Sequence, residues 1–83
     1  MELNFPCEYV FKAFGPGTSS GFAGAVQQAV ATVVPVPLDA MKVRLSGQGK
    51  YQSVSVMLLL HNLEQVHAIY QALKKVPDLQ YLL

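Results

Sequence analysis

The chain has 83 residues, of which 52% are hydrophobic and 13% are charged, and its net charge is +1 at pH 7. This length allows one domain with a small core, and the apolar, charge-poor composition excludes an intrinsically disordered chain. The same composition predicts that apolar surface remains after the core is formed, which favours self-association.

Cysteine content and hydropathy exclude further classes. The single cysteine, Cys7, excludes an internal disulfide and a multi-cysteine metal site. The most apolar run, residues 54–60, is far shorter than a membrane helix, and the first residues lack the pattern of a secretory signal. We therefore expect a cytoplasmic protein without a membrane segment.

The first third of the chain predicts a strand followed by a helix. Residues 8–14 alternate with a two-residue period that places Tyr9, Phe11 and Ala13 on one face, as is typical of a strand. We expect Gly-Pro-Gly at 15–17 to end this strand. A helix should follow, with a hydroxyl N-cap from residues 18–20, and it should end by about Val33 because prolines follow at 35 and 37.

The middle of the chain predicts a β-hairpin. Residues 38–45 should form a second strand with Met41, Val43 and Leu45 inward. The glycine-bearing turn at 46–49 should join it to a third strand, which runs to about Leu60 and turns its even-numbered apolar residues inward.

The last third predicts a second helix and a closing strand. Asn62 and Gln65 resemble a capping box, and Pro77 should stop the helix. Residues 79–83 alternate again, with Leu79 and Tyr81 inward.

This order of elements predicts a single α+β domain over residues 1–83, a ferredoxin-like βαββαβ two-layer sandwich. Both helices should lie on one face of an antiparallel sheet with strand order 4-1-3-2. The predicted core consists of Tyr9, Phe11, Val26, Val30, Val43, Val54, Val56, Leu58, Val66, Ile69, Leu73 and Tyr81.

Several segments resemble the YbeD-like family of small bacterial proteins of unknown function. Residues 49–56, Gly-Lys-Tyr-Gln-Ser-Val-Ser-Val, are similar to a strand motif of that family, residues 4–15 to its opening, and residues 63–73 to its second helix. The resemblance implies a ferredoxin-like fold reminiscent of ACT regulatory domains and an association with the control of lipoate metabolism. It brings no catalytic residue and no cofactor.

Chemistries that this topology often hosts lack their residues here. Heavy-metal chaperones need Cys-x-x-Cys in the first strand–helix loop, and acylphosphatase-like enzymes need an arginine there, whereas the only arginine is Arg44. His61 and His67 have no third ligand and no nucleophile placed nearby by the sequence. We therefore predict no metal, no cofactor and no enzymatic activity.

Two candidate sites remain. Gly15, Gly17, Thr18 and Ser19 could form a ligand loop, since glycines before a helix N-terminus allow an anionic group to approach the backbone. The alternative is an ordinary Gly-Pro turn. The second candidate is an interface on the sheet face away from the helices, formed by Val10, Phe14, Met57, Leu59 and Leu82.

The sequence therefore predicts a non-catalytic regulatory or adaptor domain that binds a protein partner or a small effector, with a homodimer or a protein partner on the open sheet face. The alternative is a nucleic-acid-binding module acting through Lys12, Lys42, Arg44 and Lys50. It is disfavoured because the basic residues are scattered. In addition, Ser53 stands where RNA-recognition modules carry their key stacking aromatic.

Overall fold

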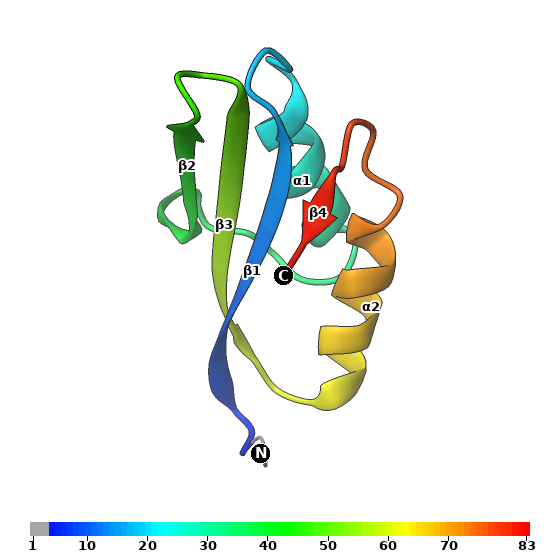
Figure 1. The fold of residues 1–83 in the computed structure, drawn as a ribbon. Coiled ribbons are helices and arrows are strands. Elements are labelled where there is room, and N and C mark those ends of the chain that lie inside the picture. Colours follow the sequence, from blue (N-terminus) through cyan, green and yellow to red (C-terminus); the bar gives the residue numbers. More distant parts are fainter. Residues whose placement is uncertain (1–3) are drawn as a thin grey trace.

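The protein, described over residues 4–83 by a computed structural model, consists of a four-stranded sheet with two helices on one of its faces (Figure 1). The elements are β1 (Cys7–Pro16), α1 (Phe22–Ala31), the 3-10 turn η1 (Leu38–Ala40), β2 (Met41–Ser46), β3 (Tyr51–Leu60), α2 (Leu63–Leu73) and β4 (Tyr81–Leu82). The sheet is antiparallel in the order β2-β3-β1-β4. The predicted two-layer α+β sandwich and its strand order are confirmed.

The two central strands, β1 and β3, pair over their full length, from Cys7 opposite Leu60 to Pro16 opposite Tyr51. The prediction that β1 stops at residue 14 was wrong, because Gly15 and Pro16 continue the ladder. The absence of a side chain at Gly15 leaves room for Phe22, since a Cβ there would lie 2.8 Å from its ring and the ring would have to shift.

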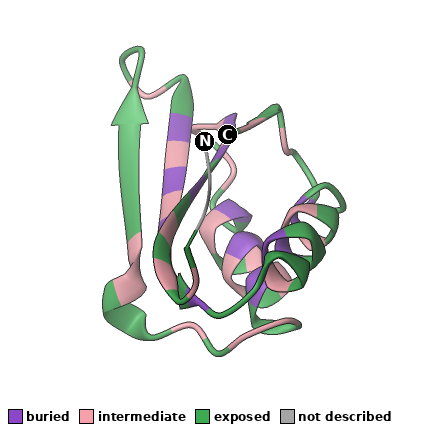
Figure 2. Cartoon of the chain, turned by 90° about the horizontal axis from the view of Figure 1, so that it is seen from below, coloured by how far each residue is buried: buried purple, intermediate pink, exposed green. Residues whose placement is uncertain are grey.

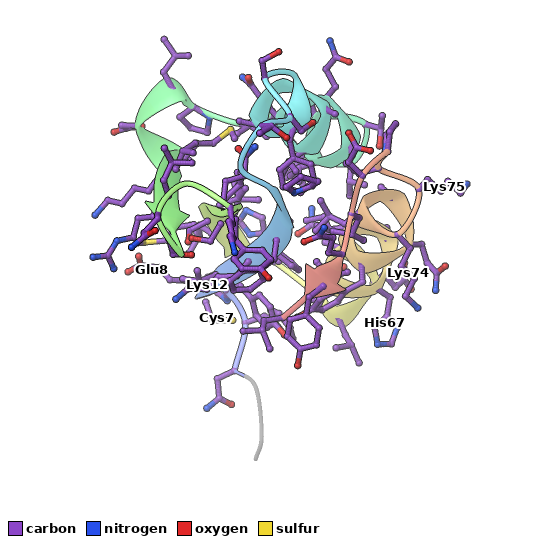
Figure 3. All side chains as sticks on the ribbon, turned by 45° about the horizontal axis from the view of Figure 1, so that its top comes forward. Cys7, Glu8, Lys12, His67, Lys74 and Lys75 are labelled. Carbon is purple, nitrogen blue, oxygen red and sulfur yellow. The ribbon has the colours of Figure 1, made fainter. Side chains whose placement is uncertain are left out.

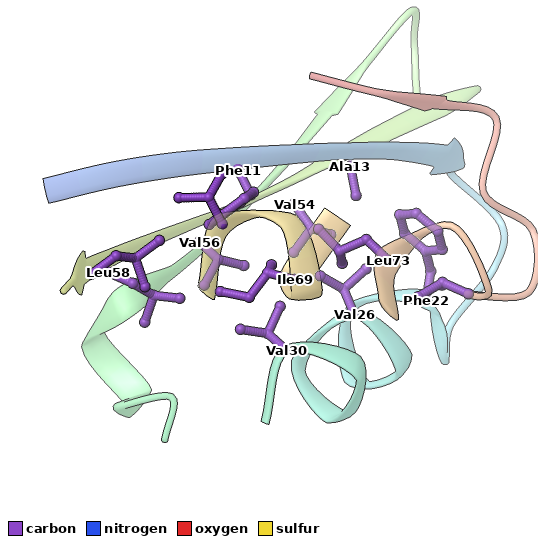
Figure 4. Packing of buried hydrophobic residues seen from close by; sticks show 13 residues of the cluster. Phe11, Ala13, Phe22, Val26, Val30, Val54, Val56, Leu58, Ile69 and Leu73 are labelled. Carbon is purple, nitrogen blue, oxygen red and sulfur yellow. The ribbon is translucent and has the colours of Figure 1, made fainter. Parts of the chain in front are cut away.

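The core lies between these central strands and the helices (Figure 4). β1 contributes Phe11 and Ala13, and β3 contributes its even-numbered residues from Val54 to Leu60. They pack against the buried stripes of the helices, which consist of Phe22, Val26 and Val30 in α1 and of Val66, Ile69 and Leu73 in α2. The predicted core is confirmed except at Tyr9, Val43 and Tyr81.

Val43 is exposed because β2 is an edge strand beyond the cover of the helices. Figure 2 draws β2 in the colour of exposed residues after its first residue, Met41. Val43 and Leu45 point to the same side of the sheet as the buried residues of β3, but neither α1 nor α2 lies over them (Figure 2). Tyr9 is half-buried and packs against the edge of the core.

Of the two residues predicted to face inward in the closing segment, Leu79 does so and Tyr81 does not. Leu82 lies opposite Ala13 and packs against the core, whereas Tyr81 is exposed opposite Phe14. Leu79 does pack inward, but the strand includes only Tyr81 and Leu82. The alternation counted from residue 79 therefore does not carry over to residue 81.

Of the two predicted helix N-caps, one is confirmed and the other was wrong. Asn62 caps α2 by accepting a hydrogen bond from the Gln65 backbone N–H at 2.9 Å, and the Gln65 side chain accepts one from the backbone N–H of His61. This confirms the capping prediction for α2. The N-cap of α1 is Gly21 and makes no side-chain bond, so the expected hydroxyl cap was wrong.

Candidate binding surface on the outer face of the sheet

The outer face of the sheet, on the side away from the helices, carries an exposed apolar patch formed by Val10, Met57 and Leu59. Val10 lies opposite Met57 on the paired central strands, and Leu59 lies one row away, opposite Glu8. Their side chains are 46%, 47% and 57% exposed, respectively. We call these three residues the apolar patch.

Four of the five predicted interface residues lie on this outer face, namely the apolar patch and the half-buried Phe14. The expectation that Leu82 also points away from the helices was wrong, because it packs against the core. Tyr81 takes the outward place beside Phe14, with 5.8 Å between the two ring centroids.

Three cations from two strands that are far apart in the sequence, β1 and β2, meet in two neighbouring rows of the outer face. Lys12 and Lys42 lie on either side of Ser55, and Arg44 lies opposite Ser53 in the next row. A surface hollow at this point is lined by the three cations together with Val43 and Ser55. We call Lys12, Lys42 and Arg44 the basic band.

Of the other charged groups considered, Asp39 lies beside the basic band, whereas Lys50, Lys74 and Lys75 lie outside it. Asp39 of η1 lines a second hollow with Lys42 and two residues of the apolar patch. Lys50 lies in the turn between β2 and β3, outside the band. Lys74 and Lys75 follow α2, on the side of the molecule away from Lys12 (Figure 3).

The predicted ligand loop, residues 15–19, makes hydrogen bonds to other parts of the chain. The backbone N–H of Gly17 donates to the carbonyl of Lys50 at 2.8 Å, and a Cβ at Gly17 would overlap the carbonyl oxygen of Gly49. Ser19 donates its hydroxyl hydrogen bond to Asp78 at 2.9 Å, and Thr18 is exposed. The loop is thus fastened both to the β2–β3 turn and to the segment before β4.

Gln52 is the residue of this region that sequence reasoning missed. It is 6% exposed, and its side-chain amide donates to the carbonyl oxygens of Pro16 and Ser19, at 2.8 Å each. Its even number in β3 was the available signal, because that parity directs a side chain inward, where a polar group needs partners.

Two tyrosines, Tyr9 and Tyr70, pack beside Phe11 at the edge of the core. The hydroxyls of Tyr9 and Tyr70 lie 3.2 Å apart, and the rings of both pack with Phe11. Burial, and then the hydrogen bond with Tyr9, raise the pKa of Tyr70 to about 12. Tyr70 therefore keeps its proton at neutral pH, and its hydrogen bond with Tyr9 joins α2 to β1.

The histidines, the cysteine and the acidic residues of the described chain do not gather into a metal-binding cluster. Among residues 4–83, no group of three or more His, Cys, Asp or Glu side chains could hold a metal ion. His61 and His67 are exposed, and Cys7 is a half-buried free thiol. Neither α1 nor α2, the helices of this part of the chain, combines the length and the apolar character needed to cross a membrane.

Comparisons with known proteins support the same fold and family. The family model described as "Protein of unknown function (DUF493)" matches residues 1–83. A UPF0250 protein of Pasteurella multocida is 30% identical over 83 residues, covering 98% of this chain and 90% of the relative. A UPF0250 protein of Idiomarina loihiensis is 26% identical over 81 residues, with the same coverage of both chains.

A solved structure shares the fold. The solution structure of protein HP0495 from H. pylori superimposes with a TM-score of 0.73 over 100% of this chain and 87% of that one, at 15% sequence identity. The resemblance to a family of small bacterial proteins of unknown function is thereby confirmed. The names of these relatives mention no enzymatic activity.

Proposed function

Since the chain belongs to the DUF493 family of proteins of unknown function, we propose that it is a non-catalytic regulatory or adaptor domain. Its binding surface is the outer face of the sheet, and its ligand is a protein, either a second copy of the chain or a different partner. Cytoplasmic location is part of this proposal, whereas the association with lipoate metabolism stays an expectation from the resemblance alone.

The apolar patch is the observation that carries the proposal. Val10, Met57 and Leu59 are adjacent on the two central strands, each about half exposed, on a face that neither helix covers. Contiguous apolar patches on soluble proteins commonly mark interaction sites. A partner that covered these side chains would gain about 25 cal/mol for each Å² of apolar area removed from water.

Substitution of Leu59 by glutamate tests the patch. We expect Leu59→Glu to abolish self-association or partner capture without unfolding the domain, because the side chain points to solvent in the monomer. Leu63→Glu is the matched control, since Leu63 is similarly exposed (49%) but lies at the start of α2. Light scattering over a concentration series and capture on immobilised protein measure the effect, and circular dichroism checks the fold.

Two results would contradict the proposal. In the first, the wild type stays monomeric and captures the same proteins as Leu59→Glu. In the second, Leu59→Glu unfolds the domain, which would mean that Leu59 belongs to the core.

A nucleic-acid-binding role is the second candidate, and one specific observation favours it. Because β1 runs to Pro16, the half-buried Phe14 lies within the paired strand, one row from Lys12 and two strands from Arg44. Aromatic rings beside cations on an open sheet suit single-stranded nucleic acid. The affinity for a labelled oligonucleotide should then fall steeply with salt concentration, whereas a salt-independent signal would exclude this role.

A small effector at loop 15–19 has less support. Within the loop, the hydroxyl of Ser19 is engaged by Asp78, the backbone N–H of Gly17 by Lys50, and the carbonyls of Pro16 and Ser19 by Gln52. A ligand that used these groups would have to displace their hydrogen bonds. We therefore consider the loop a weaker candidate for the binding site than the outer face of the sheet.

A further inference from the structure

The strand β2 keeps an apolar side that nothing in the described chain covers. Val43 and Leu45 are 51% and 63% exposed, and Leu38 in the preceding turn η1 is 90% exposed. In the same strand, Lys42 and Arg44 point to the outer face. The strand therefore presents apolar side chains to one side and cations to the other, and both sets are open to solvent.

The free edge of β2 also offers backbone hydrogen-bonding groups. β2 pairs with β3 on one side, and residues 4–83 place no strand on its other side (Figure 1). An edge strand leaves every second N–H and C=O unpaired and can accept a further strand. Such an added strand would bring its own side chains opposite Val43 and Leu45 on one face and opposite Lys42 and Arg44 on the other.

We propose that β2 binds an extended segment of a protein partner as an added strand of the sheet. The segment carries carboxylates at alternate positions, which face Lys42 and Arg44, and apolar side chains between them, which face Val43 and Leu45. Binding by strand addition takes its affinity from the backbone and its specificity from alternate side chains. The inference deepens the proposed function, since it rests on a protein partner, but it uses the edge of the sheet and not the apolar patch.

A second copy of the chain fits this edge poorly. An antiparallel β2–β2 pair with Val43 opposite Val43 would set Lys42 opposite Arg44 twice, and a shift by one pair sets Arg44 against Arg44. Like charges directly opposite each other in a sheet are destabilising. The cations thus act against self-pairing of this edge and leave an acidic strand as the favoured partner.

An acidic peptide is favoured over nucleic acid by the chemistry of the edge itself. Nucleic acid would satisfy Lys42 and Arg44 but neither the backbone groups of the edge nor the apolar side of Val43 and Leu45. A peptide strand satisfies all three.

Peptide titrations followed by NMR test the proposal. The probes are two short peptides in which valine and threonine alternate either with glutamate or with lysine. We expect the glutamate peptide to shift the amide signals of residues 41–46 at concentrations up to about 1 mM. The lysine peptide should bind at least about tenfold more weakly.

Charge-reversal variants make the test specific. Lys42→Glu combined with Arg44→Glu should reverse the preference between the two peptides. The matched control is Lys74→Glu combined with Lys75→Glu, which changes the net charge by the same amount at the end of α2 and should leave the preference unchanged. N-methylation of the glutamate peptide at its bonding positions should abolish binding, because strand addition needs its backbone N–H groups.

Four outcomes would overturn the proposal. They are no shift in residues 41–46 at the highest peptide concentration, equal effects of the two double variants, unchanged binding of the N-methylated peptide, and stronger shifts with oligouridine than with the glutamate peptide. Shifts in β2 that grow with protein concentration alone would indicate a second copy instead. The Leu59→Glu experiment reports on the apolar patch independently, so failure at β2 and failure of the proposed function are distinguishable.

Discussion

Val43 and Val54 lie directly opposite each other on neighbouring strands, yet one is 51% exposed and the other is fully buried. Both are valines, both point to the helix side of the sheet, and both belong to strands with the same alternation. The difference is that the helices pack over β3 and β1 and stop short of β2 (Figure 2). Alternation therefore decides which way a side chain points, while burial depends on what lies above it.

Alanine substitution at Val43 and at Val54 should give the largest difference in the free energy of unfolding. Val54→Ala removes two buried methyl groups and leaves a cavity, so we expect it to lower the free energy of unfolding by about 2–3 kcal/mol. Val43→Ala should change it by less than about 0.5 kcal/mol, as is usual for surface positions. Urea denaturation measures both values, and a similar loss for the two variants would show that β2 is covered in solution.

Gln52 offers an intermediate case, because it is a buried polar residue on the same strand as Val54. Gln52→Ala removes the two hydrogen bonds to Pro16 and Ser19 and should cost about 1–2 kcal/mol. The exposed Gln71 of α2 gives a matched control, since Gln71→Ala removes no hydrogen bond found in the structure. Amide hydrogen exchange should also become faster in the β1–α1 loop of the Gln52→Ala variant, because the loop loses its hydrogen bonds to Gln52. Unchanged exchange there would contradict a role of Gln52 in holding the loop.

The smallest effect concerns the hydroxyl pair of Tyr9 and Tyr70 on the covered side. Because the pKa of Tyr70 is raised from 10.0 to about 12 in the folded protein, the folded state holds this proton more tightly than the unfolded chain. The corresponding stabilisation is fully present below pH 10 and is lost as the pH rises towards about 12. Tyr9→Phe should lower the pKa of Tyr70, which ultraviolet absorbance titration measures, and an unchanged value would leave burial as its sole cause.

The sequence by itself determined the order of elements, their approximate bounds and most of the core. These features depend on local physics, since prolines and glycines end elements and a two- or 3.6-residue period directs side chains to one face. Phe11, Val56 and Ile69 were identified in this way, and so was the outward direction of Met57 and Leu59. The Asn62 cap was also readable, because its partner lies only three residues away.

Tertiary structure alone decided which inward faces are covered and which distant residues meet. Val43 is exposed because the helices do not reach β2. Tyr81 faces outward because the alternation of β4, which begins at Tyr81, does not continue the inward direction of Leu79. Lys12 is 30 and 32 positions away from Lys42 and Arg44 in the sequence, and it becomes their neighbour only through the pairing of β1 and β2 with β3. The register of β1 on β3, which sets Lys12 opposite Ser55, joins distant parts of the chain, so no short window of the sequence contains it.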